Sequence, residues 1–335
     1  MAMNTRSLRQ SVREALGPAA EARLREGLWK ALGQPLYAEH PSAFPYGLSS
    51  WIASLAWPKR LISLDDHPSD RSVRWGQKLQ GVTHDDKRWY ISQKEHLLRV
   101  PVEADLNENR PFDWSIPDYL VDRGAAHVGA IDHHAGKIYV PLEGTTPATL
   151  LVLDAATFAV VGEAPLTPQG QEAPWCAVHP RTGLVYSSAF YDEPAAIVVH
   201  VYEPIWSGGR MVRCDPVGQL HLRTRGGGEL IHLNRIQGGA FSPQGHLYLV
   251  ADKRDLGLHG FDSATGCLMF NQAVDYRPGL PYCEELQGLT IWDLDDGRAP
   301  LIRGQLHLMM LDQDPVGDEV YFKHYGVDAE DRDRI

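Results

Sequence analysis

One histidine, three glutamines and a Pro-Trp pair recur at matching points of a repeated pattern. The repeated segments are Gln80-Gly81-Val82-Thr83, His127-Val128-Gly129-Ala130, Pro174-Trp175-Cys176-Ala177, Gln237-Gly238-Gly239-Ala240 and Gln287-Gly288-Leu289-Thr290. Histidine transfers protons near neutral pH because its unperturbed pKa lies there, so His127 is the predicted proton-transfer group. Glutamine amides could hold hydroxyl or carbonyl oxygens, and Trp175 could stack on a sugar or a flat apolar substrate.

Charged and polar residues next to these positions extend the predicted site. Glu172 lies just before Pro174, Glu285 lies just before Gln287, and Asn234-Arg235 lies just before Gln237. Glu285 or Glu172 could orient the imidazole or act as its acid–base counterpart. The predicted catalytic residues are therefore His127, Glu285 and Glu172, and the predicted substrate-binding residues are Gln80, Trp175, Gln237, Gln287, Asn234 and Arg235.

The recurring glutamines also have a purely structural interpretation. Most buried polar side chains bond to backbone or water, so each amide could simply bridge neighbouring strands. A buried polar group without a partner costs about 1 to 3 kcal/mol, so the amides must satisfy one another, water or a ligand. The third copy replaces the polar residue by Pro174-Trp175, and an asymmetric ring of this kind suits an asymmetric ligand.

Other motifs with possible chemistry are weak. Gly226-Gly227-Gly228 lacks the Lys-Ser/Thr of a phosphate-binding loop, and no organic cofactor is predicted. Asp132-His133-His134 could suggest a metal site, but it falls in an expected turn and is interpreted as solvated, as is His179-Pro180. A divalent cation held by Glu285, Asn234 and amide oxygens is kept only as a secondary hypothesis.

The spacing of the repeated segments indicates what must position these residues. Successive first positions are 47, 47, 63 and 50 residues apart. Each segment is followed by a strand-like run, and four of the five runs carry one tyrosine. The runs are Arg88 to Ile91, Lys137 to Val140, Leu184 to Ser187, His246 to Leu249 and Gln305 to Leu311. Repeats of this length that are built from short strands resemble the blades of a β-propeller.

The resemblance is to a five-bladed β-propeller over about residues 59–326, and it is to an architecture rather than to a named family. It implies that the first strand of each blade is innermost and that its opening residue faces the central channel near one mouth. Glycine beside that residue would let the backbones approach closely. Lys59 to Leu64 is predicted to supply the outer strand of the last blade, which closes the ring. Six blades are the alternative, because Gln219 to Arg223 is an additional strand-like piece.

The two ends of the chain differ from the repeats. Residues 1–58 contain two short amphipathic patterns, which predict an α-helical N-terminal extension that could cap the channel or form a homodimer contact. Residues 59–326 are the predicted propeller domain, and residues 327–335 are a charged tail.

Composition excludes several partners. The formal net charge is -11 without a basic cluster, which argues against a nucleic-acid or an anionic-membrane partner. No apolar run of membrane-spanning length and no signal-peptide pattern occurs, so a cytoplasmic protein is expected. The four cysteines have no CxxC spacing and are expected to be free thiols.

Two classes of function follow from these residues. The first is an enzyme that acts on a small organic substrate in the channel mouth by histidine and carboxylate acid–base chemistry, as a hydrolase, lyase, isomerase or cyclase. The second is a non-catalytic propeller that binds glycan or protein partners. Divergence among the five equivalent positions favours the enzyme, because near-identical sites would be expected of a repeated binding platform.

Overall fold

Short apolar runs separated by turns rich in Asp and Gly form strands, as the sequence predicts. The computed structural model describes residues 61–251, 257–272, 274, 284–314 and 317–327. The helical extension, the possible homodimer contact and the charged tail were predicted at positions that lie outside the described residues, apart from residue 327. Within the described residues, no helix reaches the length and apolarity that a bilayer crossing requires.

The strands form antiparallel groups that follow one another along the chain. The groups are β2 (Leu79–His84), β3 (Arg88–Gln93), β4 (His96–Pro101) and β5 (Trp114–Ser115); β6 (His127–Val128), β7 (Asp132–His134), β8 (Lys137–Glu143), β9 (Thr149–Asp154) and β10 (Val160–Pro165); β11 (Ala177–Val178), β12 (Val185–Ser187), β14 (Val198–Ser207) and β15 (Arg210–His221); β17 (Ile236–Phe241), β18 (Leu247–Ala251), β19 (Gly257–Phe261) and β20 (Leu268–Gln272); and β21 (Glu284–Ile291), β22 (Leu306–Asp314), β23 (Gly317–Val327) and β1 (Leu61–Arg71). A parallel contact between Gly162 and Met211 joins β10 to β15.

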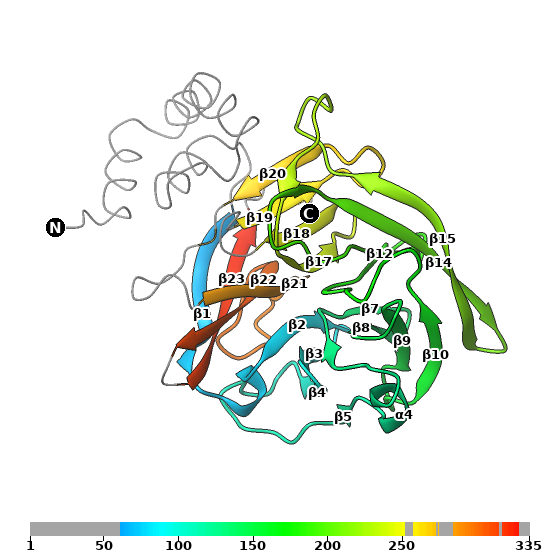
Figure 1. The fold of residues 1–335 in the computed structure, drawn as a ribbon. Helices are drawn as coiled ribbons and strands as arrows, with labels where there is room; N and C mark the ends of the chain where they lie inside the picture. The colour runs from blue at the N-terminus through cyan, green and yellow to red at the C-terminus, as the bar shows by residue number, and fades with distance from the viewer. Residues whose placement is uncertain (1–60, 252–256, 273, 275–283, 315–316, 328–335) are drawn as a thin grey trace.

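These groups are arranged radially around a common centre, so the chain folds as a β-propeller (Figure 1). Strands β2, β7, β17 and β21 lie toward the centre of the view. The first strand of the described chain, β1, pairs antiparallel with the last, β23, and places Leu61 opposite Val327. The prediction that the segment ending at Leu64 supplies this outer strand is confirmed from residue 61 onward.

Glycines of the repeated segments, in or next to the inner strands, let the backbones touch around the centre. A Cβ atom on any of them would lie within 2.6 Å of a backbone atom of another repeated segment. The contacts are Gly81 with Ala130, Gly129 with Pro174, Gly238 with Gln287 and Gly288 with Gly81. We call Gly81, Gly129, Gly238 and Gly288 the glycine ring. Because equivalent residues meet, the inner strands run in the same direction, with the repeat's opening residues at one end of the channel.

The hydrophobic core lies between neighbouring sheets. In one cluster, Trp89 of β3 is fully buried against Phe322 of β23 and Trp292, with ring centroids 5.3 Å and 4.6 Å apart. Edge-to-face geometry of this kind is favourable for aromatic pairs beyond the area that they bury. The core therefore fixes each sheet against the next and sets the distances between inner strands.

Two buried histidines form a hydrogen-bonded chain within this part of the core. Nδ1 of His307 lies 2.9 Å from Nδ1 of His324, while their Nε2 atoms lie 2.8 Å from the Trp292 carbonyl and 2.9 Å from the His67 carbonyl. Two neutral imidazoles carry only one N–H each, so at most two of these three contacts are hydrogen bonds when the pair is neutral. Burial lowers the pKa of both rings, which favours that neutral state.

We expect the protein to lose stability as the pH falls from about 6.5 to about 4. Burial lowers the pKa of His84 from 6.5 to about 4 and lowers those of His307 and His324. A histidine whose pKa is lower in the folded than in the unfolded protein is protonated first in the unfolded chain. Its contribution to the free energy of unfolding is therefore complete above pH 6.5 and is lost as the pH falls toward the folded-state pKa. For His84 this loss is about 3 kcal/mol. Asp132 opposes this loss, because its pKa is raised from 3.8 to about 6 and its contribution is lost as the pH rises.

Urea denaturation at several pH values checks this expectation. Three histidines outweigh one aspartate, so the free energy of unfolding should fall on acidification. His84→Gln should lose less stability than the wild type over the same interval, whereas His96→Gln, at a solvent-accessible hydrogen bond to Ser115, should lose as much as the wild type. An unchanged free energy of unfolding between neutral and mildly acidic pH would contradict the assignment.

Candidate functional site

His127 forms a hydrogen-bonded pair with a carboxylate at the predicted mouth. Its strand, β6, pairs with β8 so that His127 lies opposite Glu143, and Nδ1 of His127 contacts Oε2 of Glu143. The other carboxylate oxygen accepts the Ala173 backbone N–H at 2.9 Å. The side chains are 26% and 17% exposed, and Nε2 of His127 has no hydrogen-bond partner among the described residues. A bond from Nδ1 to a carboxylate fixes the ring and leaves Nε2 to exchange protons.

Glu172 is electrostatically coupled to this pair. Its pKa is raised, first by desolvation of part of the carboxyl group and then by the negative charge of Glu143, with a further contribution from Asp192. A hydrogen bond to the Phe190 backbone acts in the opposite direction. Two carboxyl groups close together cannot both ionise freely, so Glu172 retains its proton to higher pH than an isolated glutamate.

Arg235 connects the next part of the mouth. Its guanidinium binds Asp192 at 2.8 Å and Glu285 at 3.4 Å, and it lies 5.2 Å from the centre of the Phe190 ring. The backbone of Arg235 has φ +50°, a left-handed conformation that residues other than glycine rarely adopt. Its N–H donates to the Tyr191 carbonyl at 2.8 Å, which holds the strained turn in place.

The glutamines of the repeat do not satisfy one another. Gln287 is 1% exposed and donates from Nε2 to Oε2 of Glu285 at 3.1 Å. Its Oε1 atom and the Nε2 atom of Gln237 are both buried without a hydrogen-bond partner among the described residues. Gln80 donates from Nε2 to the Lys78 carbonyl at a long 3.5 Å. One orphaned acceptor and one orphaned donor therefore lie in neighbouring inner strands.

Two of the predicted binding residues are placed differently from the expectation. Trp175 is fully buried: its Nε1 donates to Ser188 Oγ at 2.9 Å, and a Cβ on Gly239 would lie 2.5 Å from its ring. The prediction of a stacking face is corrected, because core packing covers the ring. Asn234 is 2% exposed and donates to the Asp192 carbonyl at 2.8 Å, so it braces the loop that carries Asp192. The aromatic side chain beside the mouth residues is that of Phe190.

The structure links the predicted mouth residues through groups that the sequence did not single out. We call the linked side chains the mouth network: His127, Glu143, Glu172, Asp192, Arg235, Glu285 and Gln287. Glu143 could have been found from the sequence, because the hairpin of β6 and β8 pairs it with His127. Phe190 and Asp192 lie in an irregular loop, and no periodic pattern in the sequence points to them.

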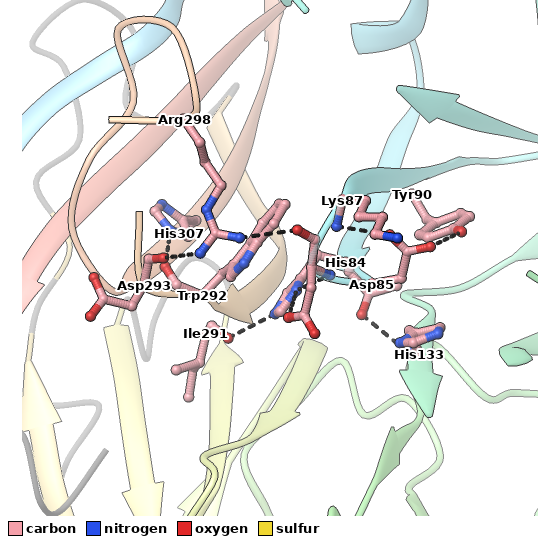
Figure 2. A network of polar contacts seen from close by, with 12 residues as sticks. His84, Asp85, Lys87, Tyr90, His133, Ile291, Trp292, Asp293, Arg298 and His307 are labelled. Carbon is pink, nitrogen blue, oxygen red and sulfur yellow. Dashed lines mark hydrogen bonds and ion pairs between the residues drawn. The ribbon is translucent and has the colours of Figure 1, made fainter. Parts of the chain in front are cut away.

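A pocket of about 160 Å³ lies at the other end of the inner strands. We call it the far pocket; it is lined by Thr83, His84, Asp85, Asp86, Asp132, His133, His134, Val178, Pro180, Ala240, Phe241, Thr290 and Ile291. It shares no residue with the mouth network, and the glycine ring lies between the two. Figure 2 shows the side where His84, Asp85 and His133 meet the segment from Ile291 to Arg298.

Asp132 connects three inner strands beside the far pocket. Its Oδ1 accepts the Thr83 hydroxyl at 3.0 Å and the His133 N–H at 2.8 Å, and its Oδ2 accepts the Val178 N–H at 2.7 Å. Desolvation raises the pKa of Asp132 to about 6 despite these hydrogen bonds. The prediction that Asp132-His133-His134 forms a solvated turn is wrong, because the segment is strand β7 and is partly buried. His179 is likewise buried, at 8% exposure.

A loop after β21 packs against His84, one of the residues that line the far pocket. His84 stacks on Trp292 with ring centroids 4.3 Å apart, and its Nε2 lies 2.9 Å from the Ile291 carbonyl (Figure 2). Arg298 donates to the carbonyls of Asp86 at 3.0 Å and Asp293 at 3.2 Å. These contacts attach the β2–β3 turn to the loop and hold the His84 imidazole against the indole.

The metal hypothesis receives no support from the described part of the chain. No group of three or more His, Cys, Asp or Glu side chains there has an arrangement that could hold a metal ion. Glu285, which was considered as a ligand, instead accepts from the Arg235 guanidinium and from the Gln287 amide.

Comparisons with known proteins find other β-propellers but no matching family. No family model and no curated protein matches the chain. Three similar solved structures share 10% sequence identity with the chain: a luciferin-regenerating enzyme, a PQQ-bound aldose sugar dehydrogenase from Streptomyces coelicolor and the WD40 β-propeller domain of Doa1. Their TM-scores are 0.42, 0.41 and 0.38, in that order. The alignments cover 73%, 81% and 73% of this chain and 76%, 98% and 78% of the respective neighbour. These neighbours include enzymes and a WD40 domain, and likeness at this level carries no argument about function.

Proposed function

We propose that the protein is an enzyme that acts on a small organic substrate at the mouth network by acid–base chemistry. The observation that carries the proposal is the His127–Glu143 pair next to Glu172, whose pKa is raised. A reaction that removes one proton from the substrate and delivers another needs two neighbouring groups that differ in proton affinity.

Each member of the site has a distinct role in this proposal. Glu143 orients His127 through Nδ1 and stabilises the imidazolium that forms when Nε2 takes a proton from the substrate. Glu172 delivers a proton to the leaving or rearranging group, because its raised pKa makes the acid form more accessible than that of an ordinary glutamate. Arg235 holds Glu285 and Asp192 in place and supplies the positive charge of the site.

The orphaned amide atoms suggest what the substrate carries. A hydroxyl group accepts one hydrogen bond and donates another, so it could accept from Nε2 of Gln237 and donate to Oε1 of Gln287. A buried amide atom left unsatisfied costs about 1 to 3 kcal/mol, and a substrate hydroxyl would remove that cost on binding. We therefore propose a hydroxylated substrate rather than a wholly apolar one.

Comparative metabolite profiling tests the enzyme proposal, because it does not require the natural substrate to be known in advance. The purified protein is incubated with a small-molecule extract, and mass spectrometry follows which compounds are consumed or formed. We expect conversion of at least one hydroxylated compound by the wild type and a loss of about 100-fold or more in its rate with His127→Gln. Glu143→Gln should also slow the reaction, because the imidazole then loses its orienting carboxylate.

His96→Gln provides the matched control for this experiment. The same substitution there removes an imidazole on β4 that contacts the Ser115 hydroxyl on β5 and takes no part in the mouth network, so conversion should stay at the wild-type rate. Conversion that persists in His127→Gln would remove the histidine from the mechanism. An extract left unchanged by the wild type would favour the second hypothesis, a non-catalytic propeller that binds glycan or protein partners.

We also propose that the ring has five blades. The support is that each of the five repeated segments opens one antiparallel group of strands, and that β1 completes the last of them. The additional strand-like piece from Gln219 onward largely continues β15, which pairs with β14 along its length. The long interval before Gln237 therefore holds an extended hairpin, and a sixth blade is not needed to account for it.

A further inference from the structure

A chain of hydrogen bonds runs from the core of the third strand group to the His127–Glu143 pair. It begins at Tyr202 of β14 and passes through Gln169, and both of these side chains are buried. Gln169 lies in the connection between β10 and β11, which also carries Glu172. Neither Tyr202 nor Gln169 belongs to the mouth network, and the repeated pattern of the sequence does not point to either of them.

Three hydrogen bonds make up this chain. The Tyr202 hydroxyl donates to Oε1 of Gln169 at 2.8 Å, and Nε2 of Gln169 donates to the Glu172 carbonyl at 3.1 Å. That carbonyl and the Ala173 N–H belong to one peptide group, and the N–H donates to Oε1 of Glu143 at 2.9 Å. The other oxygen of this carboxylate contacts the imidazole of the pair, so the chain ends at the proposed base.

Chemistry fixes the direction of every hydrogen bond in the chain. A backbone carbonyl only accepts, so the Gln169 amide must turn its Nε2 toward Glu172 and its Oε1 toward Tyr202. The Oε1 atom only accepts as well, so the tyrosine hydroxyl must donate. Burial raises the pKa of Tyr202, which retains the proton that it donates. All the donors therefore point toward the carboxylate, and each polarises the next.

The peptide group between Glu172 and Ala173 links the two proposed proton-transfer groups. Its carbonyl accepts from Gln169 and its N–H donates to Glu143, so a shift of this peptide would move the carboxylate and the imidazole that it contacts. Glu172, the proposed acid, is attached to the same peptide. The hydrogen bond from Gln169 thus bears on the acid and on the base, and a misplacement of about 1 Å can slow a reaction about 100-fold.

We propose that Tyr202 and Gln169 are positioning residues of the mouth network, which set the orientation of the His127 imidazole. Their effect on a rate rests on the proposed acid–base function, whereas the state of the imidazole can be measured without a substrate. With Nδ1 bonded to the carboxylate, the neutral His127 ring carries its proton on Nδ1 and leaves Nε2 unprotonated. Loss of the chain loosens the carboxylate and lets the other tautomer form.

Nitrogen NMR of the full-length protein with isotope-labelled histidine tests this proposal, because the shifts of the two ring nitrogens report which one carries the proton. The His127 signals are those that His127→Gln removes. At about pH 9, well above the usual pKa of histidine, we expect mostly the Nδ1–H form in the wild type. Its ratio to the Nε2–H form should fall about tenfold in Gln169→Met and by a smaller factor in Tyr202→Phe, which loses only the outermost donor.

Tyr90→Phe is the matched control. Tyr90 is fully buried like Tyr202, and its hydroxyl donates to Asp85 at 2.7 Å and lies 3.1 Å from the Ala155 carbonyl. None of these three residues belongs to the mouth network. Removal of either hydroxyl should lower the urea midpoint by a similar amount, but only Tyr202→Phe should change the tautomer ratio of His127.

Conversion of the compound found by metabolite profiling gives a second readout. Its rate should fall about tenfold in Gln169→Met and stay at the wild-type value in Tyr90→Phe. If the wild type converts no compound, the enzyme proposal fails, and the tautomer ratio still decides the positioning role. If Gln169→Met does not fold, Tyr202→Phe decides in the same way. An unchanged ratio in the folded variant, or an equal change in Tyr90→Phe, would overturn the proposal.

Discussion

Replacing Asp132 by alanine should lower the free energy of unfolding by about 3 to 5 kcal/mol. The carboxylate accepts two backbone N–H groups, from His133 and Val178, and the Thr83 hydroxyl, at 2.7 to 3.0 Å. Alanine leaves these donors without their acceptor in a partly buried place, and each unsatisfied donor costs about 1 to 3 kcal/mol. Because the three donors belong to three different inner strands, their loss should weaken the centre of the propeller.

Asp154→Ala is a matched control for this prediction. Asp154 also accepts two backbone N–H groups, from Ala156 and Thr157, and one threonine hydroxyl, from Thr157, at 2.8 to 3.1 Å. Those hydrogen bonds lie at an exposed turn, where water replaces the lost acceptor, so the cost should be about 1 kcal/mol or less. Urea denaturation of both variants gives the comparison, and equal losses would show that Asp132 has no special structural role.

The second large effect is expected at the glycine ring. In Gly288→Ala the new Cβ would lie 2.5 Å from the Gly81 Cα and 3.0 Å from the Val82 backbone nitrogen. Both are backbone atoms of the neighbouring inner strand, so no side chain can rotate away to make room. Overpacking against a rigid neighbour should destabilise the protein by about 3 kcal/mol or more, measured as a lower urea midpoint or as loss of soluble folded protein.

Gly218→Ala separates this steric effect from the general effect of adding a methyl group to a strand. Gly218 lies in β15, where the nearest atom to an added Cβ is the Val201 Cβ at 4.0 Å. Alanine is less flexible than glycine in the unfolded chain, so this variant should be unchanged or slightly more stable than the wild type. If Gly288→Ala were equally well tolerated, the inner strands could not be in the close contact described above.

Much of the fold was predictable because it repeats. The repeated segments that open with Gln or His form or adjoin inner strands, and the runs after them form the second strands. The turn sequence at Asp154 reverses the chain through hydrogen bonds from its own aspartate, as local turn chemistry requires. These features depend on residues near one another in the chain, so a single sequence carries them.

The candidate site was predictable only in part. The spacing placed His127, Gln237 and Gln287 at equivalent points, and the inner strands bring those points to one end of the channel. Glu143 was missed although the hairpin of β6 and β8 sets it opposite His127. The binding role predicted for Trp175 is wrong, because an aromatic residue at this point of the repeat can either contact a ligand or pack in the core. Its packing against Gly239, which only the tertiary structure shows, places it in the core.

The sequence by itself determined the repeat, the order of strands along the chain and which segments form or adjoin inner strands, because periodicity and turn chemistry are local. The tertiary structure alone decided which polar groups meet. The contacts of Arg235 with Asp192 and Glu285, and of Asp132 with Thr83 and Val178, join residues that lie about 40 to 50 positions apart in the sequence. Such distances depend on how tightly the inner strands pack around the glycine ring, and that packing is a property of the closed propeller as a whole.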